Sequence, residues 1–279
     1  MPLPLDFQFS QSSLQDYLDC PRRFELRHLQ KVKWPAPISE PILEHERRIL
    51  LGEQFHHTLH QYFIGIPPEL LAASLNSDEL RDWWAAFNRS ALLETLPENH
   101  YPEKMFTVSW GGYRFVAKLD LLAGSPGERW VIVDWKTSTN RSPLRFLKDR
   151  IQSRLYPFLL VLAGSSLNNG KPILPDQVEM IYWFANFSGQ TETLQYSQEK
   201  YQKDQEDFKK LAYEISNIPT GKFLLTDDER KCLFCNFRSL CNRGITAGDW
   251  HEMEEEAPEI RDSGSLQDFD FDQIGEIAF

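Results

Sequence analysis

One segment, residues 113–136, constrains the fold most strongly; its sequence is YRFVAKLDLLAGSPGERWVIVDWK. Residues 113–122 are rich in apolar and aromatic side chains, and residues 130–134 form a nearly continuous apolar run. Such a run is typical of a strand that is buried on both faces. The intervening Gly-Ser-Pro-Gly at 124–127 contains strong chain breakers. The sequence therefore predicts a buried hairpin around which the rest of the chain is built.

Two carboxylates and one lysine interrupt this apolar hairpin. Asp120 lies on its first strand, and Asp134 and Lys136 lie on its second. Because Asp134 and Lys136 are two residues apart, a strand presents them on the same face. Burying such charges without partners is costly, and a divalent cation offsets that cost. We therefore predict that the carboxylates bind Mg²⁺ through oxygen ligands, with Lys136 beside the water or phosphate oxygen that reacts.

Helices and further strands flank the hairpin. Helices are expected at residues 10–29, 42–63, 78–93, 145–162 and 197–218, and strands at 105–110, 177–184 and 191–196. This order predicts an α/β or α+β domain, and we assign it to the α/β class, with a mixed central sheet flanked by helices.

The negative charge of the chain is concentrated at one end. Residues 249–279 contain eleven Asp and Glu against one Arg, so they carry -10 of the net charge of -11. The remaining body is nearly neutral and can still hold a basic groove. Because the acidic runs EMEEEAPE and DFDFDQ are typical of disorder, we predict a folded domain over 1–248 and a disordered tail over 249–279.

The sequence also bears on the compartment of the protein. No apolar run reaches the roughly 18 residues that a membrane-spanning helix requires. The N-terminal MPLPLDFQFS lacks the basic and apolar regions of a signal peptide. We therefore expect a cytoplasmic protein without a membrane partner.

Two of the expected helices carry polar residues at helical spacing. In the first, Gly52 is followed by His56, His57 and His60, and periodicity alone does not separate these three candidates for a metal ligand. In the second, Gln152 and Tyr156 share a face because they are four residues apart. The second helix also carries four basic residues, which form either a solvated face or a phosphate-binding face: Arg145, Lys148, Arg150 and Arg154.

The four cysteines form a pattern rather than a scatter. Cys20 stands alone, and Cys232, Cys235 and Cys241 follow as C-x2-C-x5-C. Disulfides do not persist in a reducing cytoplasm, whereas four thiolates can hold Zn²⁺ or an iron–sulfur cluster. Zinc usually takes two C-x2-C pairs, and here one cysteine has no nearby partner in sequence.

Taken together, these motifs resemble those of the PD-(D/E)XK nuclease superfamily, and more closely its branch with the nuclease domains of RecB and AddB. The resemblance rests on Gly52 to His56, Asp120, the VDWKTS stretch and Gln152 to Tyr156. It implies a metal site for Mg²⁺ or Mn²⁺ and selects His56 by its distance from the glycine. The implied roles are metal ligation by His56, Asp120, Asp134 and the carbonyl of Trp135, catalysis by Lys136, and support by Gln152 and Tyr156.

The cysteine pattern adds a second resemblance. One cysteine before the nuclease core and three after it is similar to AddB and to the iron–sulfur exonuclease of CRISPR adaptation. This implies a 4Fe–4S cluster bound by Cys20, Cys232, Cys235 and Cys241, with Zn²⁺ as the alternative. The cluster would act as a clasp between the N- and C-terminal parts. By the chain-entropy rule for cross-links, such a clasp stabilises a fold by roughly 5 kcal/mol.

The resemblance leads to a functional expectation. We expect a metal-dependent DNA nuclease, an exonuclease on single-stranded DNA or ends, that acts in DNA repair, recombination or foreign-DNA processing, with any helicase on a separate chain. The alternatives are a non-catalytic DNA-binding subunit of a helicase–nuclease complex and a zinc-clasped RNA-processing enzyme. Polarity, endo or exo action, and preference for DNA or RNA stay open, as does the acidic tail's role in solubility or in competing with DNA.

Overall fold

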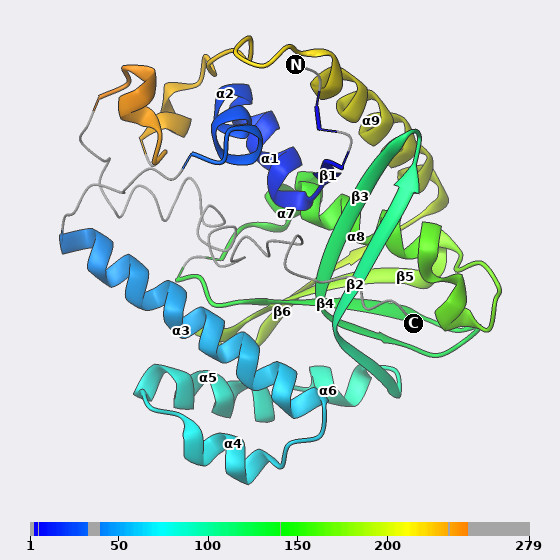
Figure 1. Ribbon diagram of the computed structural model, residues 1–279. Helices are drawn as coiled ribbons and strands as arrows, with labels where there is room; N and C mark the ends of the chain where they lie inside the picture. The colour runs from blue at the N-terminus through cyan, green and yellow to red at the C-terminus, as the bar shows by residue number, and fades with distance from the viewer. Residues whose placement is uncertain (1–2, 5, 33–39, 140, 234, 245–279) are drawn as a thin grey trace, which may run out of the picture.

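The computed structural model describes residues 3–4, 6–32, 40–139, 141–233 and 235–244 (Figure 1). The predicted tail, 249–279, lies outside them. Within the described residues, six strands form one mixed sheet between helices, which confirms the predicted α/β architecture. The strands are β1 (Gln8–Phe9), β2 (Asn99–Trp110), β3 (Tyr113–Gly124), β4 (Trp130–Lys136), β5 (Val178–Phe184) and β6 (Gln190–Gln195).

The strand order is β1-β3-β4-β5-β6, with β2 paired to β3 outside this path. The β1–β3 and β4–β5 pairs are parallel, and the others are antiparallel. The α-helices are α1 (Gln11–Asp19), α2 (Pro21–Phe24), α3 (Glu40–Phe63), α4 (Pro68–Ser74), α5 (Asp78–Asn88), α6 (Leu92–Thr95), α7 (Leu144–Asp149), α8 (Ile151–Ala163) and α9 (Gln198–Asn217). Shorter turns are the π-helical η1 (Glu25–Leu29) and the 3-10 helices η2 (Gly164–Asn168), η3 (Pro175–Gln177), η4 (Ala185–Phe187), η5 (Glu229–Cys232) and η6 (Arg238–Cys241).

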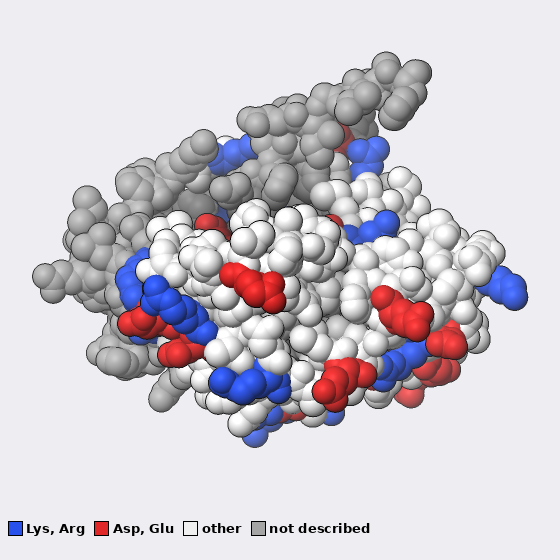
Figure 2. All heavy atoms as spheres, turned by 90° about the horizontal axis from the view of Figure 1, so that it is seen from below, with Lys and Arg blue, Asp and Glu red and all other residues white. Residues whose placement is uncertain are grey.

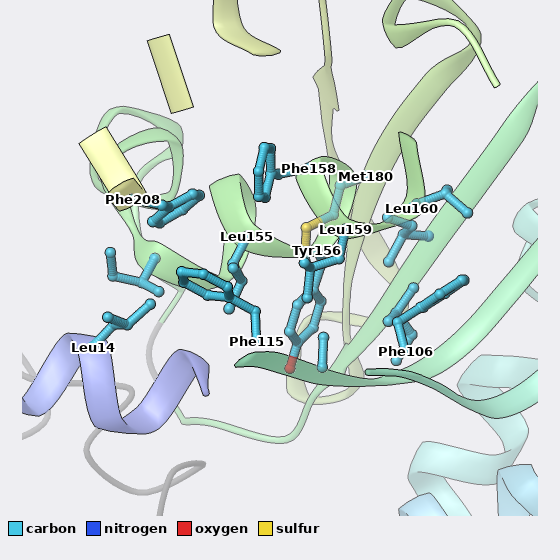
Figure 3. Packing of buried hydrophobic residues seen from close by; sticks show 14 of the residues in the cluster. Leu14, Phe106, Phe115, Leu155, Tyr156, Phe158, Leu159, Leu160, Met180 and Phe208 are labelled. Carbon is cyan, nitrogen blue, oxygen red and sulfur yellow. The ribbon is translucent and has the colours of Figure 1, made fainter. Parts of the chain in front are cut away.

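The two faces of the sheet bury two separate clusters of apolar side chains. On β4, Ile132 packs into the first cluster and Val133 into the second, as the alternation of a strand requires. The first cluster lies under α1, α8 and α9 and includes Leu155 and Phe208 (Figure 3). The second lies under α3 to α6 and includes Phe55. Every residue of β4 is buried, as its apolar run predicts.

Serine N-caps fix the start of several helices. Ser10 forms a capping box with Ser13 at the start of α1. Ser77 and Ser197 accept hydrogen bonds from backbone N–H groups in the first turns of α5 and α9. These caps satisfy N–H groups that have no partner within the helix, so the helices begin where the sequence places such residues.

The single helix expected over 145–162 is wrong. The chain forms two helices, because Arg150 adopts an extended conformation (φ -69°, ψ 144°) between α7 and α8. Ser153 then donates a hydrogen bond to the carbonyl of Leu147, so the two helices are joined at an angle. The proposed basic face is therefore divided, and Arg154 forms ion pairs with Asp204 and Asp207 of α9.

Two other boundaries differ from expectation, and one helix was not predicted. The helix expected over 78–93 ends at Asn88, and α6 follows separately. Strand β2 begins at Asn99 rather than at 105, since the pairing with β3 runs to Gly124. Helix α4 was not expected at all.

In the described part of the chain, no helix is long and apolar enough to cross a membrane.

Candidate active site

The partner strand on one edge of β3 changes near Asp120, and we call this position the fork of the sheet. Strand β2 pairs along the whole of one edge of β3, so β1 and β4 share the other edge. On that edge the pairing with β1 ends at Phe115 of β3, and the pairing with β4 begins at Leu121 of β3. Asp120 therefore lies where the two partner strands diverge, at the end of the β4 ladder.

A local distortion turns Asp120 out of the regular pleat. Leu119 packs into the first apolar cluster and Leu121 into the second, so the alternation of side chains reverses between them. On β2, Glu103 has a φ of 50°, in the left-handed region, and is missing from an otherwise continuous ladder. In a regular strand, the side chains of Leu119 and Leu121 would lie on the same face of the sheet. Because they lie on opposite faces here, the Asp120 carboxylate between them can reach the edge of the sheet.

Two groups hold the carboxylate of Asp120. The backbone N–H of Trp135 donates a hydrogen bond of 3.0 Å to its Oδ2. The Nδ1 atom of His56 lies 3.5 Å from the same oxygen, and the two side chains are 30% and 25% exposed. The imidazole of His56 on α3 and the carboxylate of Asp120 on β3 thus meet where both side chains are partly exposed to solvent.

The charge of Asp120 is favoured by these neighbours. Burial raises the pKa of the Asp120 carboxyl, but attraction to His56, the hydrogen bonds from His56 and the Trp135 N–H, and the charge of Lys136 together outweigh burial. The pKa is therefore lowered, and the group remains a carboxylate that can accept hydrogen bonds or bind a cation.

Asp134, Lys136 and Gln152 form a closed ring of polar contacts. The Nζ atom of Lys136 lies 2.9 Å from Asp134 Oδ2 and donates a hydrogen bond of 3.2 Å to Gln152 Oε1. Gln152 in turn donates from Nε2 to Asp134 Oδ1. All three side chains are buried. Each charge or dipole has a partner within the ring, and these contacts offset the loss of water.

Tyr156 lies one turn after Gln152 on α8 and is buried. Figure 3 shows its ring among apolar side chains of the first cluster, with the hydroxyl oxygen pointing toward the sheet. Burial raises the pKa of the Tyr156 hydroxyl, and the carboxylates of Asp134 and Asp120 raise it further. The hydroxyl therefore stays protonated.

Gly52 lets α3 approach the end of β4. A Cβ atom at this position would lie 2.8 Å from Oγ1 of Thr137, the residue after Lys136. One turn earlier, Arg48 donates a 3.4 Å hydrogen bond to Thr139. Residues 48, 52 and 56 share one face of α3, so the same close approach brings His56 to Asp120.

The other two candidate histidines lie apart from this carboxylate. His57 is exposed, and its ring is 6.4 Å from that of His60. His56 is the histidine whose Nδ1 atom lies 3.5 Å from Asp120, and its role as a metal ligand stays a prediction.

The donors fit a divalent cation by chemistry but are not gathered around one point. Among the described residues, no three His, Cys, Asp or Glu side chains are placed to hold a metal ion. His56 and Asp120 face each other, whereas Lys136 and Gln152 engage the carboxylate of Asp134. An imidazole nitrogen and two carboxylates are suitable ligands for Mg²⁺ or Mn²⁺, provided that Asp134 turns from its present partners.

The four cysteines are free thiols. Cys20 is buried between α1 and α2, and the other three lie in and around η5 and η6. Burial raises the pKa of the Cys232 thiol, and Cys235, Cys20 and Cys241 raise it further. The clasp itself remains a prediction, because no three of these thiols are placed to hold a metal in the described part of the chain.

Contacts other than cysteines already join the two ends of the domain. The backbone N–H of Arg22 donates to the carbonyl of Leu224 at 3.0 Å, and Lys231 Nζ lies 3.2 Å from Asp19 Oδ1. The ring of Phe223 packs 5.6 Å from that of Phe24. We call residues 221–233 and 235–241 the late segment, and Figure 1 shows its last part, in orange, beside α2.

Sequence reasoning missed several residues around the site. Trp83 of α5 donates from Nε1 to Asn186 Oδ1 at 2.9 Å. Asn186 donates to the carbonyls of Thr137 and Ser138 at 2.7 and 3.1 Å, so it holds the backbone that leaves β4. Tyr182 of β5 lies under Lys136. Each was invisible in sequence because its role depends on strand β5 lying next to β4, which no local motif encodes.

The face covered by α3 to α5 does not present a basic stripe in the described residues. Figure 2 shows acidic and basic side chains interspersed there with a wide area of other residues. Arg47 pairs with Glu79, and Arg81 lies 2.5 Å from Asp78. Because clustered positive charge is the usual footprint of a nucleic-acid platform, this face is a poor candidate for one.

Comparisons with known proteins bear on the family and on the fold. A sequence profile of the PD-(D/E)XK nuclease superfamily matches residues 8–242. A crystal structure from Eubacterium rectale named "Putative exonuclease" has a TM-score of 0.51 at 12% identity, and the match covers 90% of this chain and 93% of that chain. The structure of SSO0001 has a TM-score of 0.43 at 12% identity, over 85% of this chain and 86% of that chain. No functionally curated protein matches the chain. The first likeness shows the fold alone.

Proposed function

The chain belongs to the PD-(D/E)XK nuclease superfamily, and from this premise we propose that it is a metal-dependent DNA nuclease. One observation carries the proposal. A buried lysine, Lys136, lies 2.9 Å from Asp134 on one strand, next to the Asp120 and His56 pair at the fork of the sheet. Metal-dependent hydrolysis of a phosphodiester uses carboxylates that bind the cation and a positive group at the reacting oxygens, and this constellation offers both.

Each residue has a proposed role. His56, Asp120, Asp134 and the carbonyl of Trp135 would hold Mg²⁺ or Mn²⁺. When bound, the ion supplies a Lewis acid that neutralises charge on the phosphate. Lys136 orients the attacking water or stabilises the phosphate oxygens, and Gln152 holds the Lys136 ammonium, since it already bonds both Lys136 and Asp134. Tyr156 supports Gln152 from the next turn of α8.

Replacing Lys136 by alanine tests this role. We expect K136A to cleave DNA several orders of magnitude more slowly than the wild type while binding it similarly, because positioning and charge at the phosphate are lost but most contacts remain. The measurement is digestion of end-labelled and circular DNA, single- and double-stranded, with Mn²⁺ or with a chelator. K171A, which changes an exposed lysine between η2 and η3, is the matched control. A wild-type rate for K136A would refute the assignment.

We propose further that Cys20, Cys232, Cys235 and Cys241 bind a 4Fe–4S cluster, with Zn²⁺ as the less favoured alternative. The contact of Lys231 with Asp19, the neighbours in sequence of Cys232 and Cys20, supports the proposal, because it brings the segment with the other three cysteines to Cys20. Iron and sulfide analysis of brown protein would identify the cluster, and colourless protein with zinc would identify the alternative.

Loss of the cluster has a predicted consequence. We expect C235A to melt at a lower temperature than the wild type and to bind DNA more weakly, because the link between α1 and the segment around η5 and η6 is weakened. The measurements are a thermal melt and a DNA-binding titration. A variant with unchanged melting and affinity would show that the cysteines do not clasp the fold.

The wider role follows from the same proposal. The substrate is DNA, as single strands or ends, cleaved exonucleolytically in repair, recombination or foreign-DNA processing in the cytoplasm, with a separate helicase as partner. The nuclease domain would span 1–248 and the acidic tail 249–279.

A non-catalytic DNA-binding subunit is the second candidate. It is favoured by one observation: Asp134 is engaged by Lys136 and Gln152, and no three described side chains converge on a metal position. Purified protein that binds labelled DNA but leaves every substrate intact in Mn²⁺ would establish it.

A further inference from the structure

We propose that Tyr182 is a positioning residue for Lys136, an inference that rests on the proposed nuclease function. Strand β5 pairs in parallel with β4 so that Tyr182 lies next to Asp134. The side chain of Tyr182 is fully buried. Tyr182 therefore forms part of the buried surface against which the ammonium of Lys136 packs.

The ring of Tyr182 contacts that ammonium through its face. The Nζ atom of Lys136 lies 5.5 Å from the ring centroid. An aromatic face attracts a cation because its π electrons carry partial negative charge, and the attraction is strongest where water is excluded. Asp134 and Gln152 hold the same ammonium through polar contacts, so the ring contributes a further contact from the adjacent strand.

The hydroxyl of Tyr182 has a separate contact. Its oxygen lies 2.7 Å from Oγ of Ser153, the residue after Gln152 on α8. Ser153 also donates to the carbonyl of Leu147 at the junction of α7 and α8. Tyr182 thus touches Lys136 with its ring and α8 with its hydroxyl, and it fixes the distance between the lysine and the helix that carries Gln152.

The ring and the hydroxyl are separable by substitution. Y182F keeps the ring face and removes only the hydroxyl, whereas Y182L removes the ring and keeps an apolar side chain. Kinetics at saturating Mn²⁺ on end-labelled DNA would give kcat and KM for each. We expect Y182L to lower kcat by about 10–30-fold with little change in KM, the size expected of a desolvated cation–π contact. We expect Y182F to keep kcat within about threefold of the wild type, because the ring contact positions the ammonium and the hydroxyl contact with Ser153 contributes less.

A control separates positioning from packing. F115L removes an equally buried ring from β3, in the first apolar cluster and away from Lys136. It should lower the melting temperature without the loss of kcat. Y182M is the second test variant in case Y182L does not fold, since methionine fills the space without an aromatic face.

The outcomes distinguish the two levels of the proposal. A wild-type protein that does not cleave DNA would overturn the nuclease assignment itself. An active wild type whose Y182L or Y182M variant matches Y182F in kcat would overturn only the role of Tyr182. A drop in kcat that phenylalanine rescues supports it.

Discussion

Gly52 shows how one missing side chain shapes the candidate site. A glycine inside a helix weakens it by roughly 0.5–1 kcal/mol relative to alanine, so its presence in α3 calls for a reason. The reason is Thr137, whose Oγ1 occupies the space that a Cβ would need. The helix can therefore lie against the residue after Lys136, and His56, one turn further on, reaches Asp120.

We accordingly expect G52A to impair cleavage more than stability. The added methyl group must displace Thr137 or α3 by a few tenths of an ångström, while alanine's higher helix propensity offsets part of the strain. Cleavage rates and urea unfolding of the same preparations measure the two effects. T137A in the G52A background should recover activity, because it removes the clashing oxygen. Q54A, at an exposed position of α3, should change neither.

At the scale of elements, buried charges join α1 to the turn that follows it. Asp16 of α1 is almost fully buried. Its carboxylate lies 2.7 Å from Arg23 Nε, 2.9 Å from Arg27 NH1 and 2.9 Å from His28 Nε2. Burial raises the pKa of the Asp16 carboxyl, but the His28 hydrogen bond and the charges of Arg23 and Arg27 outweigh burial and hold the pKa well below its ordinary value.

This network predicts acid sensitivity. An unfolded aspartate titrates near 3.9, and the folded pKa is lower, so Asp16 stabilises the fold above pH 4 and loses that contribution as the pH falls through the folded pKa. D16N should lower the free energy of unfolding at pH 7 by roughly 3 kcal/mol, because it removes one of the two anions that pair with the buried Arg23.

Urea unfolding between pH 7 and pH 2 measures the effect of D16N. The variant should lose less stability on acidification than the wild type. D78N, which changes an exposed carboxylate of α5, should follow the wild-type curve closely. Parallel curves for D16N and wild type would contradict the argument.

At the scale of the whole molecule, sequence patterns predicted what is local. Patterns among neighbouring residues predict the apolar run of β4, the hairpin with β3 and the i, i+4 pair on α8. The structure contains all three. The break at Arg150 was missed because apolar periodicity does not record the hydrogen bond from the Ser153 side chain to the Leu147 carbonyl. Likewise, Tyr182 reaches Lys136 only through the parallel β4–β5 pairing, which joins segments far apart in the chain.

The site residues divide in the same way. Asp134 and Lys136 follow from strand geometry, since two residues apart on a strand means one face. The proximity of His56 to Asp120 followed only from family resemblance. It depends on the approach of α3, which the sequence marks with a single glycine, and on the reversal of side-chain alternation in β3, which it does not mark.

The packing of the late segment against the first helices has a consequence for synthesis on the ribosome. Glu25 is fully buried, and its carboxylate accepts a hydrogen bond from the N–H of Gly221, 196 residues later in the chain. At roughly 5–20 residues per second, translation of that interval takes about 10–40 s. All residues of the candidate site emerge during this time. The helices that are made first are therefore among the last parts of the nascent protein to reach their native surroundings.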